Sequence, residues 1–220
     1  MSAARPAGGA VPDGAADGGV RVVLATRNQH KIAEMRRILA AAGLGRIEVL
    51  GVDRFPDLPE VAETGLTFVE NAMLKAHAVA GATGLPAVAD DSGLCVDVLG
   101  GAPGVFSARW CGRHGDDAAN LDLLLAQLAD VPDPHRTAYF GCAAVLADPV
   151  GREWVAEGRL VGRLVRRPRG THGFGYDPIF LPEGEDRTAA ELSAEEKDAI
   201  SHRGRALRAL APDLRRLTQV

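Results

Sequence analysis

The pattern of hydrophobic and polar residues opens with a strand, a polar turn and a helix. The run VRVVLAT, which starts at Val20, is apolar and β-branched, as expected for a buried strand. Beyond it, Ile32, Met35 and Leu39 recur at helical spacing, and Gly43 follows where a left-handed helix C-cap is expected. The turn between strand and helix is therefore the first candidate for a functional loop.

The next part of the chain predicts a second strand over 47–52 and a helix over about 68–82. Thr67 and Glu70 have the spacing of a capping box, in which each side chain satisfies a free amide at the helix start. The segments PAVAD and LCVDV then predict two short strands, joined through Asp90-Asp91-Ser92-Gly93. This polar connection between apolar strands is a second candidate for function.

The second half of the chain predicts more strand than the first. Leucines at helical spacing indicate a helix from Asp117 to Leu128, and two long strands, 137–148 and 153–165, form a predicted hairpin. A glycine-rich loop follows at 170–178, and the last 30 residues have a mostly helical pattern. Alternating strands and helices followed by a hairpin predict an α/β fold, a mixed sheet with helices on both faces.

Composition and charge narrow the class of protein. The chain of 220 residues is 46% hydrophobic with a formal net charge of −4, which disfavours nonspecific binding to nucleic acid polymers or to anionic membranes. Residues 1–19 contain almost nothing large to bury, so we expect a disordered tail followed by a single domain over 20–220. They also lack the apolar core of a secretory signal, and no apolar run is long enough to span a membrane, so we expect a cytoplasmic protein. The three cysteines fit neither a disulfide framework nor a zinc site, and we expect reduced, buried thiols.

The loop from Thr26 to Lys31 carries groups suited to phosphate. It combines a hydroxyl, an amide side chain and a lysine with the free backbone amides and positive dipole of a helix start. The Walker A pattern is absent. Taken alone, the segment is equally well explained as a helix N-cap followed by a solvated lysine.

Asp90 and Asp91 place two carboxylates between apolar segments, which is costly unless they bind a cation, accept hydrogen bonds or share a proton. Glu63, ahead of the capped helix, can add another oxygen. Magnesium takes one or two carboxylates and completes its shell with water and substrate phosphate, so these residues suggest a magnesium site. The alternative is a tight Asx turn at a strand end, with Lys75 as a surface lysine.

The remaining candidates lie in the glycine-rich loop and the C-terminal helical region. Phe174 can stack on a ring and Asp177 can accept hydrogen bonds from ring N–H groups, although a flexible connection is the alternative. On one ideal helix Lys197 and His202 point about 140° apart, so both can reach one ligand only if the helix breaks. Ser201 is a suitable N-cap for a second helix. Taken alone, these residues are more often solvated helix charges.

Together, the segments TRNQHK, ETGLTFVENA, ADDSGLCVDVLGGAPGVFSAR, GFGYDPIF and TAAELSAEEKDAISHRGRAL resemble the non-canonical purine nucleoside triphosphate pyrophosphatases, the HAM1-like family of bacterial dITP/XTP pyrophosphatase and eukaryotic inosine triphosphatase. The resemblance covers about residues 20–215. It implies an elongated mixed β-sheet with flanking helices, in two lobes with the active site in a central cleft. It also implies a homodimer and Mg²⁺-dependent hydrolysis of ITP, dITP or XTP to the monophosphate and pyrophosphate.

The resemblance also assigns roles to individual residues. Glu63 and Asp91 are implied to hold the magnesium, and Asp91 also to act on the attacking water as the catalytic residue. The residues implied to bind substrate are Thr26, Arg27, Asn28, Gln29, His30, Lys31, Lys75, Ser92, Phe174, Gly175, Tyr176, Asp177, Lys197, His202 and Arg203. Two departures stand out, because the family usually has glycine in place of Arg27 and has no counterpart of the tail.

Two other functions compete with this one. A non-catalytic nucleotide sensor would use the same cleft without releasing pyrophosphate. A phosphomonoesterase with an aspartate nucleophile would release inorganic phosphate, but that class requires a D-x-D spacing that is missing at this strand. The chain's only three lysines, Lys31, Lys75 and Lys197, all fall in the implied site, which favours a small cationic cleft in an acidic protein.

Overall fold

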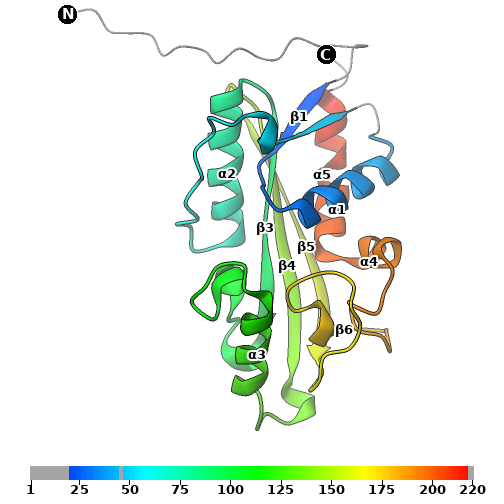
Figure 1. Ribbon diagram of the computed structural model, residues 1–220. Coiled ribbons are helices and arrows are strands. Elements are labelled where there is room, and N and C mark those ends of the chain that lie inside the picture. Colours follow the sequence, from blue (N-terminus) through cyan, green and yellow to red (C-terminus); the bar gives the residue numbers. More distant parts are fainter. Residues whose placement is uncertain (1–19, 45–46, 218–220) are drawn as a thin grey trace, which may run out of the picture.

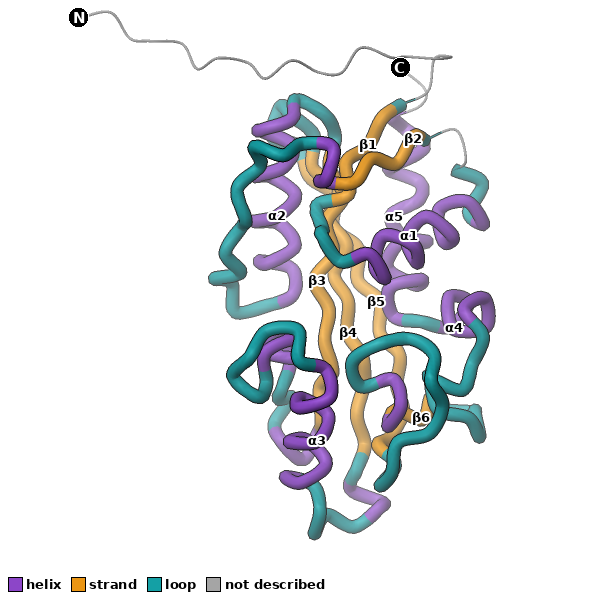
Figure 2. Tube along the Cα trace, viewed as in Figure 1, coloured by secondary structure: helices purple, strands orange, loops and turns teal. Residues whose placement is uncertain are grey.

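The fold is built on one mixed sheet of six strands in the order β2-β1-β3-β4-β5-β6, seen in the computed structural model (Figures 1 and 2). The structure describes residues 20–44 and 47–217. The strands are β1 (Arg21–Leu24), β2 (Glu48–Gly51), β3 (Ala87–Val96), β4 (Thr137–Ala147), β5 (Glu153–Leu164) and β6 (Phe180–Pro182). The helices are α1 (Gln29–Ala41), α2 (Phe68–Thr83), α3 (Asp117–Gln127), α4 (Ala194–Ile200) and α5 (His202–Leu217).

The sheet topology confirms the predicted α/β class and the long hairpin. β1 pairs in parallel with β2 and β3, whereas β3, β4, β5 and β6 pair antiparallel in sequence. One prediction was wrong: the two short strands expected around Asp90 are a single strand, β3, because Asp90 to Gly93 pair directly with β4. The polar residues therefore lie inside a strand, where alternate side chains point to opposite faces.

The helix boundaries follow the capping signals in the sequence. Thr67 and Glu70 form the predicted capping box at the start of α2, and Gly43 adopts a φ of 74° just beyond α1. The predicted break in the C-terminal region lies at Ser201, whose backbone is extended between α4 and α5. Its hydroxyl accepts a hydrogen bond from the Gly204 amide in the first turn of α5.

Two hydrophobic cores lie along the same face of β3 and are separated by polar residues. Val88 belongs to a core with α1 and α5, whereas Leu94 and Val96 belong to a second core with α3 and Phe180. The side chains of Asp90 and Ser92 occupy the same face between them. The two lobes of the molecule are thus two cores on shared long strands, and the gap between them is polar.

The opposite face of the sheet is covered by α2. Ala72, Ala76 and Ala80 of this helix pack on small residues of β3 and β4, among them Ala89 and Ala143. Asp91 faces the same helix, because it neighbours Asp90 on the strand. The two adjacent aspartates therefore serve opposite faces of the sheet.

Several further expectations have outcomes here. Cys95 and Cys142 are buried and free as predicted, but Cys111 is half-exposed because it lies in a loop near the start of α3. Within the described residues, no helix is both long enough and apolar enough to cross a bilayer. The expected tail over 1–19 lies outside the described residues.

Candidate active site

A cavity with a volume of about 870 Å³ opens beside β3, at the point where β1 no longer pairs with this strand. β1 pairs with β3 only up to Val88, and the 3₁₀ helix Gly104–Arg109 reaches the strand again near Gly93 and Leu94. The edge of β3 from Ala89 to Ser92 lies between these two contacts. Groups from both faces of the sheet can therefore reach one cavity around this edge.

The cavity collects nearly all of the residues named from the sequence. Those that line it are Thr26, Arg27, Asn28, His30, Lys31, Glu63, Lys75, Asp91, Ser92, Phe174, Gly175, Tyr176, Asp177, Lys197, His202 and Arg203. Gln29 is the exception: it is exposed at the first position of α1 and is absent from the lining.

The N-terminus of α1 faces the cavity. The Asn28 side-chain oxygen caps the helix by accepting hydrogen bonds from the amides of His30 and Lys31, at 3.0 and 3.2 Å. Arg27 donates to the carbonyl of Leu58 at 2.9 Å, so it joins the turn to the loop that carries Glu63. Lys31 extends from the first turn and lies 3.1 Å from Asp90. The positive end of the helix dipole, with cations beside it, is suited to bind an anion.

A second group of charges surrounds Lys75 of α2. Its ammonium lies 2.8 Å from a Glu63 oxygen and 3.3 Å from an Asp91 oxygen. Asn71, fully buried one turn earlier, donates to the other Asp91 oxygen at 3.2 Å. Arg109 approaches the second Glu63 oxygen at 3.4 Å from the far side of the cavity. The two carboxylates therefore converge on one point, which the ammonium occupies.

Burial and charge act differently on these groups. Burial opposes ionisation of Glu63, but the charges of Lys75, Lys31 and Arg109 outweigh it and lower its pKa. For Asp91, burial is the larger effect and the nearby Glu63 adds to it, so the pKa of Asp91 is raised despite Lys75. The pKa of Lys75 is raised because Asp91, Asp90 and Glu63 outweigh its burial. The lysine is thus a firm cation between two carboxylates of unequal acidity.

The same geometry fits a divalent cation. The ammonium of Lys75 marks a position that two carboxylates can reach together, and that position borders the cavity. No cluster of three or more histidine, cysteine or acidic side chains suited to a metal occurs in residues 20–44 and 47–217. Two carboxylates and an open side suit magnesium, which keeps water and substrate oxygens in its shell.

A third group of residues in the cavity lies around Phe174. His30 stacks on its ring at a centroid distance of 5.8 Å, and the Lys197 ammonium lies 5.2 Å from the ring centre. Lys197 also donates to Asp177 at 2.5 Å, and the same Asp177 oxygen accepts from the Phe174 amide at 2.9 Å. An aromatic face, a carboxylate and an ammonium thus stand side by side, as needed to bind a flat ring with polar edges.

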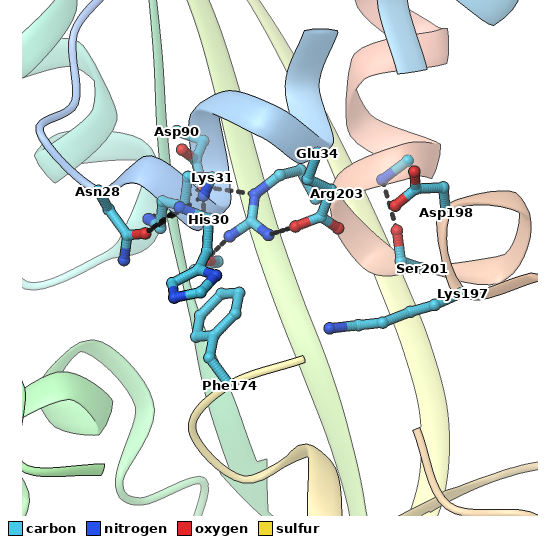
Figure 3. A network of polar contacts seen from close by, with 12 residues as sticks. Asn28, His30, Lys31, Glu34, Asp90, Phe174, Lys197, Asp198, Ser201 and Arg203 are labelled. Atoms are coloured by element: carbon cyan, nitrogen blue, oxygen red, sulfur yellow. Dashed lines mark hydrogen bonds and ion pairs between the residues drawn. The ribbon is translucent and has the colours of Figure 1, made fainter. Parts of the chain in front are cut away.

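His202 and Arg203, at the start of α5, close the back of the cavity. His202 stacks on Phe140 at 4.9 Å, and its complete burial lowers its pKa well below the usual value. Arg203 donates to Asp90 at 3.0 Å, to Ser92 at 2.9 Å and to Glu34 of α1 (Figure 3). Burial works against the charge of Arg203, but Asp90 and Glu34 outweigh it and raise its pKa.

Sequence reasoning missed three residues of this site and gave a fourth, Asp90, a different role. Asp90 was named only as half of a pair, whereas it is the buried partner of both Lys31 and Arg203. Glu34, Asn71 and Arg109 were not singled out. A signal was available for two of them, because Glu34 and Asn71 lie at helical spacing from Lys31 and Lys75 and share their faces.

Comparisons with known proteins agree with this arrangement. The model of the Ham1 family matches residues 22–213. The dITP/XTP pyrophosphatase of Streptomyces avermitilis is 68% identical over 197 residues, which cover 90% of this chain and 98% of the relative. The dITP/XTP pyrophosphatase of Mycobacterium tuberculosis is 56% identical over 197 residues, covering 90% and 96%.

Solved structures give the same result for the fold. The nucleoside-triphosphatase, or dITP/XTP pyrophosphatase, of Mycobacterium abscessus is 55% identical, with a TM-score of 0.72 over 89% of this chain and 100% of that one. A HAM1 protein from Coxiella burnetii is 43% identical, with a TM-score of 0.80 over 90% and 99%. The mixed, elongated architecture is therefore shared with proteins of this group.

Proposed function

The chain belongs to the Ham1 family, and from that premise we propose that it is a dITP/XTP pyrophosphatase that hydrolyses ITP, dITP and XTP to the nucleoside monophosphate and pyrophosphate. One observation carries the proposal. A single cavity joins the anion-binding turn of α1, the carboxylate pair of Glu63 and Asp91, and the ring site at Phe174. These are the groups that a nucleoside triphosphate requires, arranged from its phosphates to its base.

The phosphate end favours hydrolysis of a phosphoanhydride. Such a reaction needs positioning and neutralisation of negative charge more than covalent chemistry. Lys31, Lys75 and Arg109 supply positive charge from three elements around one region of the cavity. Glu63 and Asp91 would hold Mg²⁺, which when bound supplies charge neutralisation and lowers the pKa of water. Lys75 would then be free to contact phosphate.

Asp91 is suited to take the proton from the attacking water. As the water oxygen bonds to the α-phosphorus, the bond from that phosphorus to the bridging oxygen breaks and pyrophosphate leaves. The proton passes to the carboxylate of Asp91, which borders the cavity on the same side as Glu63 and Lys75. Asn71 donates to one oxygen of this carboxylate, and this contact would still orient Asp91 once Lys75 turns to the phosphate.

The base end favours a 6-oxo purine. Hypoxanthine and xanthine present an acceptor oxygen at position 6 beside a donor N1–H. Lys197 can only donate and Asp177 can only accept, and the two touch each other. Adenine reverses both groups, so it would face the lysine with an amino group and the carboxylate with a lone pair. Leaving such partners unpaired discriminates strongly between substrates.

The decisive experiment separates the products from ITP, dITP, XTP, GTP and ATP with magnesium present. We expect pyrophosphate and monophosphate from the first three, and little turnover of ATP. The Asp91→Asn variant should lose most of the rate while binding of nucleotide persists. Release of inorganic phosphate would favour the phosphomonoesterase, and binding of ITP without turnover would favour the sensor. Near-normal activity of Asp91→Asn with magnesium would contradict the assigned role of Asp91.

We further propose, from the same premise, that the enzyme acts as a homodimer in the cytoplasm. One chain has a mass of 23.1 kDa, and sedimentation of the purified protein should give twice that mass. A concentration-independent monomer that is fully active would rule out a required dimer.

A further inference from the structure

We propose that Glu34 is a positioning residue for base selection, acting through Arg203 and never touching the nucleotide. The proposal rests on the proposed function, since it concerns how the same cavity distinguishes one base from another. Glu34 lies on α1, outside the lining of the cavity, and is 4% exposed. In Figure 3 its carboxylate lies beside the Arg203 guanidinium, and the ring of Phe174 lies below.

Glu34 has one hydrogen-bonding partner within residues 20–44 and 47–217, and that partner is Arg203. One of its oxygens accepts from an Arg203 Nη, and its other oxygen is buried without a hydrogen bond. A buried carboxylate lowers the stability of a fold unless it is paired. In the described part of the chain it caps no helix and forms no second ion pair, so Arg203 is the group on which it acts.

Arg203 is held on three sides. Its Nε donates to Asp90, one Nη donates to Ser92, and the other Nη donates to Glu34. A guanidinium has five N–H groups, so three are used and two remain. The guanidinium carbon lies 5.9 Å from the centre of the Phe174 ring, at the site proposed for the base. The two remaining N–H groups can therefore serve the base edge only if the plane of the guanidinium is fixed.

Glu34 supplies the third point that fixes this plane. Asp90 and Ser92 lie on one strand and hold the Nε and one Nη of the guanidinium. With these two contacts alone, the guanidinium plane could still rotate about the line that joins the two nitrogens. Glu34 comes from α1 and holds the opposite Nη (Figure 3). Asp90 also pairs with Lys31, so the four charges of Lys31, Asp90, Arg203 and Glu34 balance to zero in the interior. If Glu34 is neutralised, this group of four keeps a net charge of +1. The hydrogen bond from Arg203 to residue 34 then has a neutral acceptor in place of a charged one.

The test compares ITP with purine riboside triphosphate, which lacks the 6-oxo group and the N1–H. The ratio to follow is kcat/KM for ITP divided by kcat/KM for purine riboside triphosphate. For Glu34→Gln we expect this ratio to fall about tenfold, the difference in free energy between a charged and a neutral hydrogen bond. The loss should appear in the KM for ITP, with kcat little changed, because a binding contact is weakened. In an Arg203→Lys background, Glu34→Gln should change the ratio no further.

The matched control is Asp148→Asn. Asp148 is also 4% exposed and accepts from an arginine, Arg152, but it lies at the β4–β5 turn away from the cavity. This variant should lower the unfolding midpoint without changing the substrate ratio. If Glu34→Gln does not fold, Glu34→Asp keeps the charge balance and withdraws the carboxylate by one methylene, and we expect a reduced ratio from it too.

The outcomes separate the two proposals. If Glu34→Gln slows both substrates equally, as a destabilised protein would, the positioning role is overturned while the enzyme assignment stands. An additive effect of Glu34→Gln and Arg203→Lys on the ratio would also overturn it, because the role acts through Arg203. If the wild-type protein releases no pyrophosphate from ITP, the proposed function itself has failed.

Discussion

The position of α5 against the sheet depends on a single glycine of β5. Gly158 faces the first turns of the helix that carries His202 and Arg203. A Cβ atom at this position would lie 2.7 Å from the amide nitrogen of Ala206 and closer still to the carbonyl oxygen of His202. Both are backbone atoms, so no side chain can move aside to relieve the contact. Replacement by alanine must push the helix away from the strand.

The size of the effect follows from these contacts. Ordinary van der Waals contact begins at 3.4 Å, so the helix must move by at least about 0.7 Å. Overpacking of this kind costs about 1–3 kcal/mol of unfolding free energy. Displacement of binding groups by about 1 Å can cost up to about 10²-fold in rate. We therefore expect Gly158→Ala to lose about 1–3 kcal/mol and at least about tenfold in kcat/KM for ITP.

Urea unfolding followed by circular dichroism gives the stability, and pyrophosphate release gives the kinetics. Gly81→Ala is the matched control, since Gly81 lies in α2 with nothing within 4 Å of an added Cβ. It should gain about 0.5–1 kcal/mol, as alanine does over glycine inside a helix, and keep its activity. Gly158→Ala with wild-type stability and wild-type KM would refute the reasoning that the glycine sets the depth of α5.

Three further predictions concern charge and capping. The Lys75 ammonium occupies the position between Glu63 and Asp91 that a divalent cation would take, so the two compete for it. Lys75→Met should therefore bind Mn²⁺ about tenfold more tightly than the wild type, both without nucleotide, in an electron paramagnetic resonance titration. Unchanged Mn²⁺ affinity would contradict this competition. The pKa of His202 in the folded protein lies below its unfolded value near 6.5, so below that pH the unfolded state binds a proton that the folded state does not. The unfolding free energy should therefore fall as the pH drops below about 6.5, by up to about 1.4 kcal/mol per pH unit. That slope should shrink in His202→Gln but persist in a variant of the exposed His114. Thr67→Ala breaks the capping box of α2 and should cost about 1 kcal/mol in urea unfolding, and a loss below about 0.3 kcal/mol would count against it.

The sequence predicted helix starts and turns well, because the groups that form them are only a few residues apart along the chain. The capping box at Thr67 marked the start of α2, and the turn-forming residues 148–151, Asp-Pro-Val-Gly, marked the turn of the long hairpin. The same local view failed at β3, where two aspartates and a serine indicated a loop. Charged residues are tolerated inside this strand because Lys31, Lys75 and Arg203 reach it from three helices. Such partners are distant in sequence, so no local pattern could show them.

The candidate site was predicted in the same uneven way. Residues that carry their own chemistry, such as Lys75, Asp91 and Asp177, were named from the sequence and line the cavity. Glu34 was missed because it is chemically ordinary until Arg203, 169 positions away, comes to lie against it. A residue that acts by holding another is visible only once the fold has brought the two together.

The neighbouring aspartates of β3 show how one strand can supply two opposite carboxylates. Burial alone would raise the pKa of Asp90, but Lys31 and Arg203 outweigh it, and its pKa is lowered. Burial also raises the pKa of Asp91, and there Lys75 does not suffice, because Glu63 lies close with the same charge. Adjacent residues of a strand point to opposite faces of the sheet, so the two aspartates contact different helices although they are neighbours in sequence. Asp90 is thus suited to remain a fixed anion that holds cations in place, while Asp91 is suited to gain and lose a proton. Exchanging the two roles would require exchanging the faces of the sheet, which the register with β4 forbids.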